Sequence, residues 1–184
     1  KKHIKTKRGA LLATMVLAIV LGVDDYFNNL TTGNVMRPVT DSHNISRAKL
    51  AYMCDATAAP VCIMMPISSW AAAVSGVADT MEGVSGLQLF ISAIPWNYYA
   101  LLTLFMLVVL AVFDLDYGPM KVHEDNAKKG DLYTTPERPY ANADDSKNST
   151  NGKVTDLVIP VIILIIFCVT GLLYSGGIFE GGIS

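Results

Sequence analysis

The chain has 184 residues, of which 52% are hydrophobic and only 16% are charged, and its mean hydropathy is +0.39. Since soluble domains carry roughly a quarter of charged residues, this composition argues against an ordinary soluble domain and favours a membrane protein. The formal net charge is −2, and the one dense basic cluster, at residues 1–8, adjoins an apolar run, which excludes a basic groove for nucleic acid.

The first apolar run, residues 9–23, is shorter than the roughly 20 residues that a helix needs to cross the hydrocarbon core. Upstream residues, buried polar residues or a break at membrane depth must therefore complete this membrane segment. The basic cluster before it predicts a cytoplasmic N-terminal side. A secretory signal peptide has a similar outline, but no small-residue cleavage site follows the run, and the next residues are Asp24 and Asp25.

Residues 24–46 are polar and include Gly33 and Pro38, together with asparagines and threonines that favour turns. This composition predicts a loop or a hairpin turn. The side chain of Ser46 is of the type found at helix N-caps, so the next helix is predicted to begin there.

Residues 46–78 are apolar overall but contain Asp55, Thr57, Pro60 and Pro66. A proline removes a backbone hydrogen bond and clashes with the carbonyl one turn earlier, so the two prolines predict a kinked or broken membrane helix. We expect the break close to Asp55 and Thr57. Because lipid cannot satisfy the freed carbonyl groups, such a break must be buried in protein or line a wet cavity, as in an ion or substrate site.

Three further apolar stretches follow. Residues 83–94 are suited to a half-helix or an interfacial segment, whereas residues 95–113 form an uninterrupted run of spanning length with aromatic residues at its start. Residues 157–174 predict a second spanning helix, and glycine pairs at Gly176 and Gly181 mark a break after it.

The stretch between the last two helices is polar, mixed in charge and rich in proline and glycine, so it predicts a mobile extramembrane loop. The chain therefore divides into membrane segments with a polar broken-helix motif at 1–113, this loop at 114–156, and a transmembrane helix with its glycine-rich break at 157–184.

Asp55 is the leading candidate for function, because an ionised carboxylate inside a membrane segment is costly unless it is solvated, paired or coordinated. It could bind Na⁺ with the Thr57 hydroxyl and freed backbone carbonyls, and protonation would compete with that binding. The plainer interpretation is that Asp55 caps a half-helix. Asp24 and Asp25 are a second candidate, since adjacent carboxylates repel and one could exchange a proton for a cation. A solvated helix end explains this pair equally well.

Neutral oxygen ligands of the type that a hard monovalent cation uses lie near these carboxylates in the sequence: Asn28, Asn29, Thr31 and Thr32. The Na⁺ ligands that we expect are Asp55, Thr57 and Asn29. Arg37 is a partner for Asp41, for Asp24 or for an anionic substrate, or else an ordinary juxtamembrane positive charge.

The remaining polar and sulfur-containing residues of the apolar runs favour packing. Ser68, Ser69 and Trp70 either line the same cavity or pack helices together. The cysteines show neither CxxC spacing nor a nearby histidine pair, so no disulfide, metal centre or cofactor is expected.

Four stretches, DDYFNNLTTGNVMRPVTD, SRAKLAY, DATAAPV and PISSWAA, together resemble the C-terminal portion of the NhaC-type Na⁺/H⁺ antiporter family, which includes Na⁺-linked malate and lactate exchangers. The resemblance is dense over residues 22–73 and looser beyond. It implies an all-α membrane protein, a polytopic helical bundle with broken or re-entrant helices and inverted repeats, of which this chain is a fragment. The positions that match the polar motifs of the family are Asp24, Asp25, Asn28, Asn29, Thr31, Thr32, Arg37, Asp41, Asp55 and Thr57.

The carboxylates and the resemblance predict part of a secondary active transporter of the bacterial plasma membrane, and not an enzyme. Na⁺ binding and protonation would compete at Asp55 and at the Asp24/Asp25 pair, with both ions as cargo. The alternative is Na⁺- or H⁺-coupled exchange of organic acids or amino acids, with Arg37 holding a carboxylate. Expected partners are the lipid bilayer, Na⁺ and H⁺, the missing parts of the same transporter chain and, as an option, a second copy in a homodimer.

Two interpretations come from other classes. An intramembrane aspartyl protease needs a GxGD-like motif where this chain reads GVDD, and cleavage of a membrane peptide that is lost on Asp55→Asn would favour it. A non-transporting membrane anchor would bind a partner through residues 114–156. Ion exchange that survives deletion of this loop would argue against the anchor.

Overall fold

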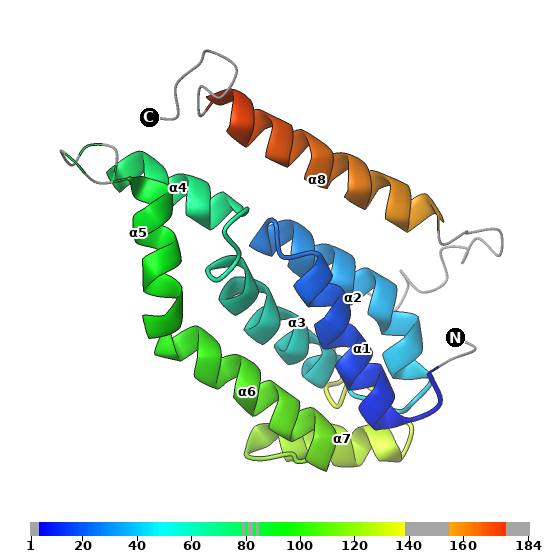
Figure 1. Cartoon of the computed structure of the whole chain (residues 1–184). Coiled ribbons are helices and arrows are strands. Elements are labelled where there is room, and N and C mark those ends of the chain that lie inside the picture. The colour runs from blue at the N-terminus through cyan, green and yellow to red at the C-terminus, as the bar shows by residue number, and fades with distance from the viewer. Residues whose placement is uncertain (1–3, 79, 81–82, 84, 139–154, 176–184) are drawn as a thin grey trace. The chain divides into compact units, whose positions relative to one another are not determined.

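The computed structural model describes residues 4–78, 80, 83, 85–138 and 155–175, which contain helices and turns but no strands. Contacts divide the chain into two units, Lys1–Thr134 and Thr135–Ser184. The helices, labelled in Figure 1, are α1 (Lys7–Val20), α2 (Asp25–Asp41), α3 (Arg47–Cys62), α4 (Ser69–Ala78), α5 (Gly86–Ala93), the 3₁₀ turn η1 (Ile94–Trp96), α6 (Tyr98–Phe113), α7 (Pro119–Lys128) and α8 (Thr155–Ser175). The described residues therefore confirm the all-helical fold class.

Four helices form the bundle of the first unit. Helices α1, α2 and α3 pack on one another, α6 lies against α1 and α3, and α7 packs against α3 (Figure 1). The core is an apolar cluster in which Leu11 of α1, Met53 of α3 and Leu107 of α6 meet Ile45 from the turn between α2 and α3. Removal of these side chains from water is the main force that holds the bundle together.

Most of residues 24–46, predicted as a loop or hairpin turn, instead form α2, and only residues 42–46 form a turn. The Asp24 carboxylate accepts a hydrogen bond from the backbone N–H of Phe27 at 2.9 Å and caps the helix. The buried side chains recur every fourth residue, on one helix face: Asn28, Thr32, Met36 and Thr40. Most of this face is polar, so a hydropathy pattern does not reveal the helix. Pro38 is tolerated because it removes only one backbone hydrogen bond near the end of the helix.

The turn between α2 and α3 agrees with the predicted start of the second helix. Asn44 adopts the left-handed conformation with φ 52°, which asparagine tolerates better than most residues. Two residues later, the Ser46 hydroxyl accepts a hydrogen bond from the backbone N–H of Lys49 at 3.1 Å. Ser46 is thus the N-cap of α3, as predicted.

The predicted break after this start is displaced along the chain. Pro60 lies inside α3, and the chain leaves the helix only at residues 63–68, around Pro66. Pro60 is tolerated because it lies in the last turn, where it removes a single backbone hydrogen bond. Asp55 and Thr57 therefore lie in the middle of an unbroken helix, and the interpretation of Asp55 as a cap is wrong.

Helices α4 and α5 form a close hairpin. A Cβ atom at Gly86 would lie 2.7 Å from the carbonyl oxygen of Ser75, so the two backbones approach too closely for a side chain at this position. At Gly76, in contrast, a Cβ atom would meet nothing within 4 Å. The short helix α5 agrees with the half-helix predicted at residues 83–94.

Residues 95–113, predicted as an uninterrupted helix, contain a break at Asn97. The Asn97 side chain accepts a hydrogen bond from the backbone N–H of Ala100 at 3.2 Å and starts α6. The segments Gly86–Trp96 and Tyr98–Phe113 are bent by 49° at this point. Among the described residues no single helix has the length and hydropathy of a membrane span, whereas this bent pair reaches both when taken together.

The polar stretch at residues 114–156 is not wholly a loop. Its first part forms α7, which packs against α3 and buries Glu124 and Ala127, so this part is a helix where a loop was predicted. A buried face of two residues is too narrow to give a periodic signal in the sequence. Residues 139–154 lie outside the described residues, as do the predicted glycine breaks at 176–184.

The second unit contains α8, which agrees with the helix predicted at residues 157–174. Pro160 lies within its first two turns, where little helix precedes the missing N–H group. The division of the chain at residues 113 and 156 stays a prediction.

Candidate functional site

Two of the polar residues singled out in the sequence meet between α2 and α3. The Asn29 amide donates a hydrogen bond to the Asp55 carboxylate at 3.3 Å, although 26 residues separate them in the sequence. Asp55 is exposed and Asn29 is half-buried, so a ligand can reach both. A carboxylate beside an amide is an oxygen-rich arrangement of the kind that hard cations bind.

The start of α2 adds a second carboxylate to this surface. Asp25 accepts a hydrogen bond from the indole N–H of Trp70 at 3.3 Å, which brings α4 to α2. Asp25 and Asn29 are four residues apart and share one face of α2, so Asp25 borders the Asn29–Asp55 pair. Asp24, in contrast, is committed to capping α2. None of these three carboxylates forms a salt bridge within the described part of the chain.

Asn28 and Thr32 lie in a buried contact between α2 and α1. The Asn28 side chain donates a hydrogen bond to the carbonyl of Ala18 at 2.7 Å and accepts one from the Thr32 hydroxyl at 3.0 Å. Both side chains are fully buried. Their hydrogen bonds are therefore used to join two helices.

Thr57 and Arg37 lie away from the Asn29–Asp55 pair. Thr57 follows Asp55 by two residues and so lies on nearly the opposite side of α3, where its buried hydroxyl donates to the carbonyl of Met53 at 2.6 Å. Arg37 follows Asn29 by eight residues, about 12 Å along the helix axis. The structure does not bring either residue to Asp55.

The other polar residues near the break have separate positions. Thr31 is half-buried on α2, and Ser69 is exposed at the start of α4. The Ser68 hydroxyl is buried and points at the carbonyl oxygens of Cys62 and Met65, at 2.8 and 2.9 Å. It therefore satisfies backbone groups that are released where α3 ends.

Within the described residues no three His, Cys, Asp or Glu side chains gather so that they could hold a metal ion. A cation at Asp55 would therefore need amide, backbone or water oxygens among its ligands.

A second group of charged residues lies at the N-terminal end of α3, and the sequence analysis missed it. We name Lys7, Lys49, Asp114, Asp116 and Glu124 the charged cluster. The Lys7 ammonium lies 2.7 Å from Asp114 and 2.8 Å from Glu124, and the Lys49 ammonium lies 2.5 Å from Asp116. Glu124 is 0% exposed and Lys49 is 2% exposed, so water screens the pairs that these two residues form little, whereas the Asp114 side chain is 35% exposed.

The first turn of α3 is held by the same region. The backbone N–H of Ser46 donates to the Glu124 carboxylate at 2.8 Å. The Arg47 side chain donates twice to Asp41, at 2.7 Å each, and its backbone N–H donates to the carbonyl of Leu132 at 3.0 Å. The partners come from α2, from α7 and from the segment after α7, so this turn is fixed from several sides.

The ion pairs of the charged cluster shift the pKa values of its members. Burial alone would raise the pKa of Glu124, but its contacts with Lys7 and Ser46 lower it below the ordinary value. Burial also opposes ionisation of Asp114, yet Lys7 holds the pKa of Asp114 below its usual value. For Lys7, burial lowers the pKa, and the bonds to Asp114 and Glu124 raise it above the ordinary value. These three groups are therefore ionised at neutral pH.

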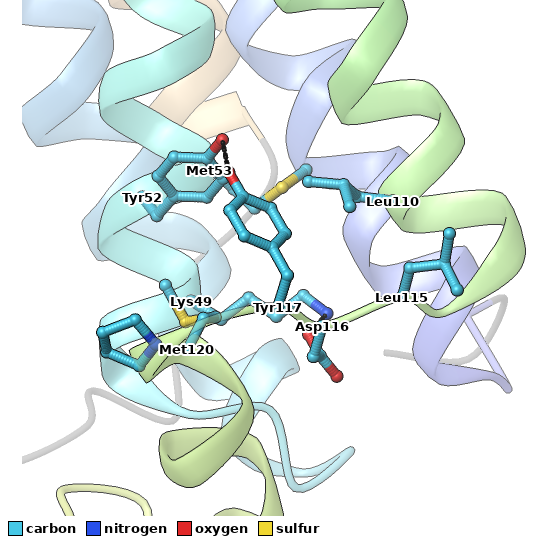
Figure 2. Close-up of a pocket in the computed structure, with 9 residues that line it drawn as sticks. Lys49, Tyr52, Met53, Leu110, Leu115, Asp116, Tyr117 and Met120 are labelled. Carbon is cyan, nitrogen blue, oxygen red and sulfur yellow. Dashed lines mark hydrogen bonds and ion pairs between the residues drawn. The ribbon is translucent and has the colours of Figure 1, made fainter.

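Beside the charged cluster lies a cavity of about 210 Å³ between α3, α6 and the link from α6 to α7 (Figure 2). Its mostly apolar lining includes Tyr52 and Met53 of α3 and Leu110 of α6. The hydroxyl groups of Tyr52 and Tyr117 lie 3.4 Å apart (Figure 2). The cavity is smaller than the roughly 300–1,000 Å³ of sites for drug-sized ligands.

The sequence carries a weak signal for the charged cluster. Lys49 is the single charged residue within the mostly apolar residues 48–54, and Asp114 and Asp116 closely follow an apolar run. A charge in such a place needs a partner. The sequence does not say which residue supplies it.

Residues 61–184 match the model of the Na⁺/H⁺ antiporter family. An uncharacterized protein of Haemophilus influenzae is 36% identical over 182 residues, which cover 96% of this chain and 33% of that protein. The chain thus spans about a third of the length of this curated relative. No solved structure matches this chain. Asn29 and Asp55 precede the matched part of this chain. The match to the family model covers 124 of the 184 residues (184 − 60), so the chain belongs to the Na⁺/H⁺ antiporter family.

Proposed function

We propose that this chain is part of an NhaC-type secondary transporter that exchanges Na⁺ for H⁺ across the bacterial plasma membrane. The observation that carries the proposal is the Asn29–Asp55 pair, an accessible carboxylate and amide joined across two packed helices. Membership of the family supports cation/proton antiport by a membrane protein. Because the chain spans about a third of its Haemophilus influenzae relative, other parts of a longer chain would complete the transport path.

In the proposed exchange Na⁺ and H⁺ compete for Asp55. When ionised, Asp55 offers its oxygens to Na⁺, and when protonated it loses the charge that holds the cation. Asn29 now donates an N–H group to Asp55, and a half-turn of the amide would place its carbonyl oxygen there as a cation ligand. The exchange needs no covalent step.

Asp25 is the second carboxylate that we assign to this surface. It lies one helical turn before Asn29, and the Trp70 indole N–H holds it in place at 3.3 Å. Asp24 caps α2, so replacing it would first destabilise the helix and would change cation binding only through that loss. The two aspartates therefore have different roles in the proposal.

We also propose a multi-pass fold with inverted repeats and discontinuous helices. Two features support it: the break at residues 63–68 between α3 and α4, and the bend at Asn97 between η1 and α6. Irregular backbone at membrane depth is stable only where protein or a water-filled cavity satisfies its polar groups. The Ser68 hydroxyl provides such a contact at the first break.

The test is transport by the whole transporter that contains this chain, in everted membrane vesicles. The collapse of a pH gradient is recorded on addition of Na⁺, K⁺ or malate. We expect Asp55→Asn, which keeps the shape and removes the charge, to abolish the Na⁺ response. Asn34→Ala is the matched control, because Asn34 is exposed on α2 and bonds to the backbone of its own helix.

Two outcomes would contradict the proposal. An unchanged Na⁺ response in Asp55→Asn, with both variants present in the membrane at the same level, would remove Asp55 from the ion site. A response to malate alone would assign the transporter to organic-acid exchange.

A further inference from the structure

We propose that the charged cluster holds α3 in the position that sets Asp55 beside Asn29, which makes Lys49 and Glu124 positioning residues for cation binding. The inference rests on the proposed function, because it concerns the same carboxylate. It gives a role to α7, a helix in a stretch that the sequence predicts as a loop.

The charged cluster joins three helices at the first turn of α3. Lys49, in that turn, lies 2.5 Å from Asp116, and the Ser46 backbone N–H donates to Glu124 at 2.8 Å. Glu124 also forms an ion pair with Lys7 of α1 at 2.8 Å, so one buried carboxylate of α7 contacts both α1 and α3. Since separating these groups would leave a buried charge without a partner, the contacts resist displacement of α3.

Helix α3 carries this constraint to the candidate site. Asp55 follows Lys49 by six residues, about 9 Å along the helix axis. The helix is unbroken from Arg47 to Cys62, so a change of tilt at its first turn moves Asp55 relative to α2. The single 3.3 Å hydrogen bond to Asn29 is too weak to fix that position alone.

The packing of α3 on this side is interrupted near its first turns, although Met53 itself belongs to the apolar core. The cavity of about 210 Å³ lies against Tyr52 and Met53, which precede Asp55 by less than one turn, and across from Leu110 (Figure 2). A void lacks the close contacts that fix one helix against another. Beside this gap the Lys49–Asp116 ion pair links α3 to the segment before α7, and the hydrogen bond from Ser46 to Glu124 links α3 to α7.

The experiment compares three substitutions of a carboxylate by an amide in the whole transporter, with the vesicle assay. Glu124→Gln and Asp116→Asn remove a charge from the charged cluster with little change of shape. Asp125→Asn is the control, because Asp125 neighbours Glu124 on α7 but has a side chain that is 47% exposed. We expect the first two to raise the Na⁺ concentration for half-maximal response roughly three- to tenfold, with a smaller change in maximal rate, and the control to match the wild type.

Glu124→Gln and Asp116→Asn proteins that reach the membrane at the wild-type level with an unchanged half-maximal Na⁺ concentration would overturn the proposal. A second measurement applies even if a variant is poorly active. Spin labels at Asn34→Cys on α2 and Ala51→Cys on α3, in a background without other reactive cysteines, report the distance between the two helices. We expect a shifted or broader distance distribution with Glu124→Gln and not with Asp125→Asn.

An unshifted distribution in Glu124→Gln would also overturn the positioning role. The distance measurement needs no transport activity. A wild-type protein without a Na⁺ response would therefore refute the proposed function, while the spin-label result would still decide whether the charged cluster positions α3.

Discussion

Glu124→Ala is the substitution for which the structure gives the clearest expected loss of stability. The Glu124 carboxylate is fully buried, contacts Lys7 at 2.8 Å and accepts a hydrogen bond from the Ser46 backbone N–H at 2.8 Å. Removing one member of a buried ion pair costs about 3–5 kcal/mol, because the other charge stays buried. Lys7 keeps a second partner, Asp114, at 2.7 Å, so we expect the lower end, about 3 kcal/mol.

The assay is equilibrium unfolding of the purified protein in mixed micelles, by titration with a denaturing detergent and detection by tryptophan fluorescence. Glu124→Gln keeps an acceptor for the Ser46 N–H and should lose less stability than Glu124→Ala. Asp125→Ala, on the exposed side of α7, should unfold like the wild type. A loss below about 1 kcal/mol for Glu124→Ala, as for a surface pair, would refute the argument that these charges are buried and coupled.

The same residues give the stability a pH dependence. The pKa values of Glu124 and Asp114 are lower in the folded protein than their ordinary values. Their contribution to the free energy of unfolding is therefore present above the ordinary carboxylate range and is lost as the pH falls through the folded pKa values. The pKa of Lys7 is raised, so its contribution is present below 10.5 and is lost as the pH rises through the folded value. We expect the contribution of these three groups to be nearly constant between about pH 5 and pH 10, and we expect Glu124→Gln to flatten the acid limb. An acid limb of unchanged slope would contradict this assignment.

Two further substitutions test helix packing in the same unfolding assay. Gly86→Ala would force a methyl group against the backbone of Ser75 and should cost about 1–3 kcal/mol of stability. Gly76→Ala fills open space, so it should be neutral or stabilise the protein by up to about 1 kcal/mol. Equal effects of the two substitutions would refute the close approach of α4 and α5. Asn28→Ala removes a buried amide that bonds to α1 and should cost about 1–3 kcal/mol, while the exposed Asn34→Ala should change little. A neutral Asn28→Ala would exclude a structural role for this contact.

Local patterns predicted those parts of the fold that depend on neighbours in the sequence. The N-cap at Ser46, the half-helix within residues 83–94 and the helix at residues 157–174 are of this kind. The choice of Asn29 and Asp55 as site residues came from their chemistry, which the sequence shows directly. Their contact depends on how α2 packs against α3, and no local pattern contains that information.

The failures have two physical causes. Helix α2 was missed because its buried face carries the polar residues Asn28, Thr32 and Thr40. Packing and hydrogen bonds hold this face against its neighbours, and a hydropathy pattern does not show them. The charged cluster was missed because it is a tertiary feature: Lys7 and Glu124 are 117 residues apart (124 − 7). In both cases the deciding interactions are contacts of polar groups, which hydropathy does not show.

Accessibility of the surface around Asp55 is the most direct property to test in the membrane. An ionised Asp55 that faced lipid would be costly, so this surface must face water or protein. Ala51 is exposed and lies one turn before Asp55 on the same face of α3, so a cysteine there reports on the site and leaves the carboxylate intact. We expect Ala51→Cys, in a background without other reactive cysteines, to react with a membrane-impermeant cationic thiol reagent, and Na⁺ to slow the reaction relative to choline.

The Na⁺ effect on the labelling of Ala51→Cys should vanish when Asp55→Asn is added, because the neutral amide no longer attracts the cation. The labelling rate is measured at constant ionic strength, so that general screening of charge does not imitate specific protection. A rate that Na⁺ leaves unchanged would contradict cation binding beside Ala51. Protection that persists in the Asp55→Asn background would mean that Na⁺ binds this surface through other groups. Asp25, which shares a face of α2 with Asn29, is the first candidate, and Asp25→Asn would then be the variant that abolishes the protection.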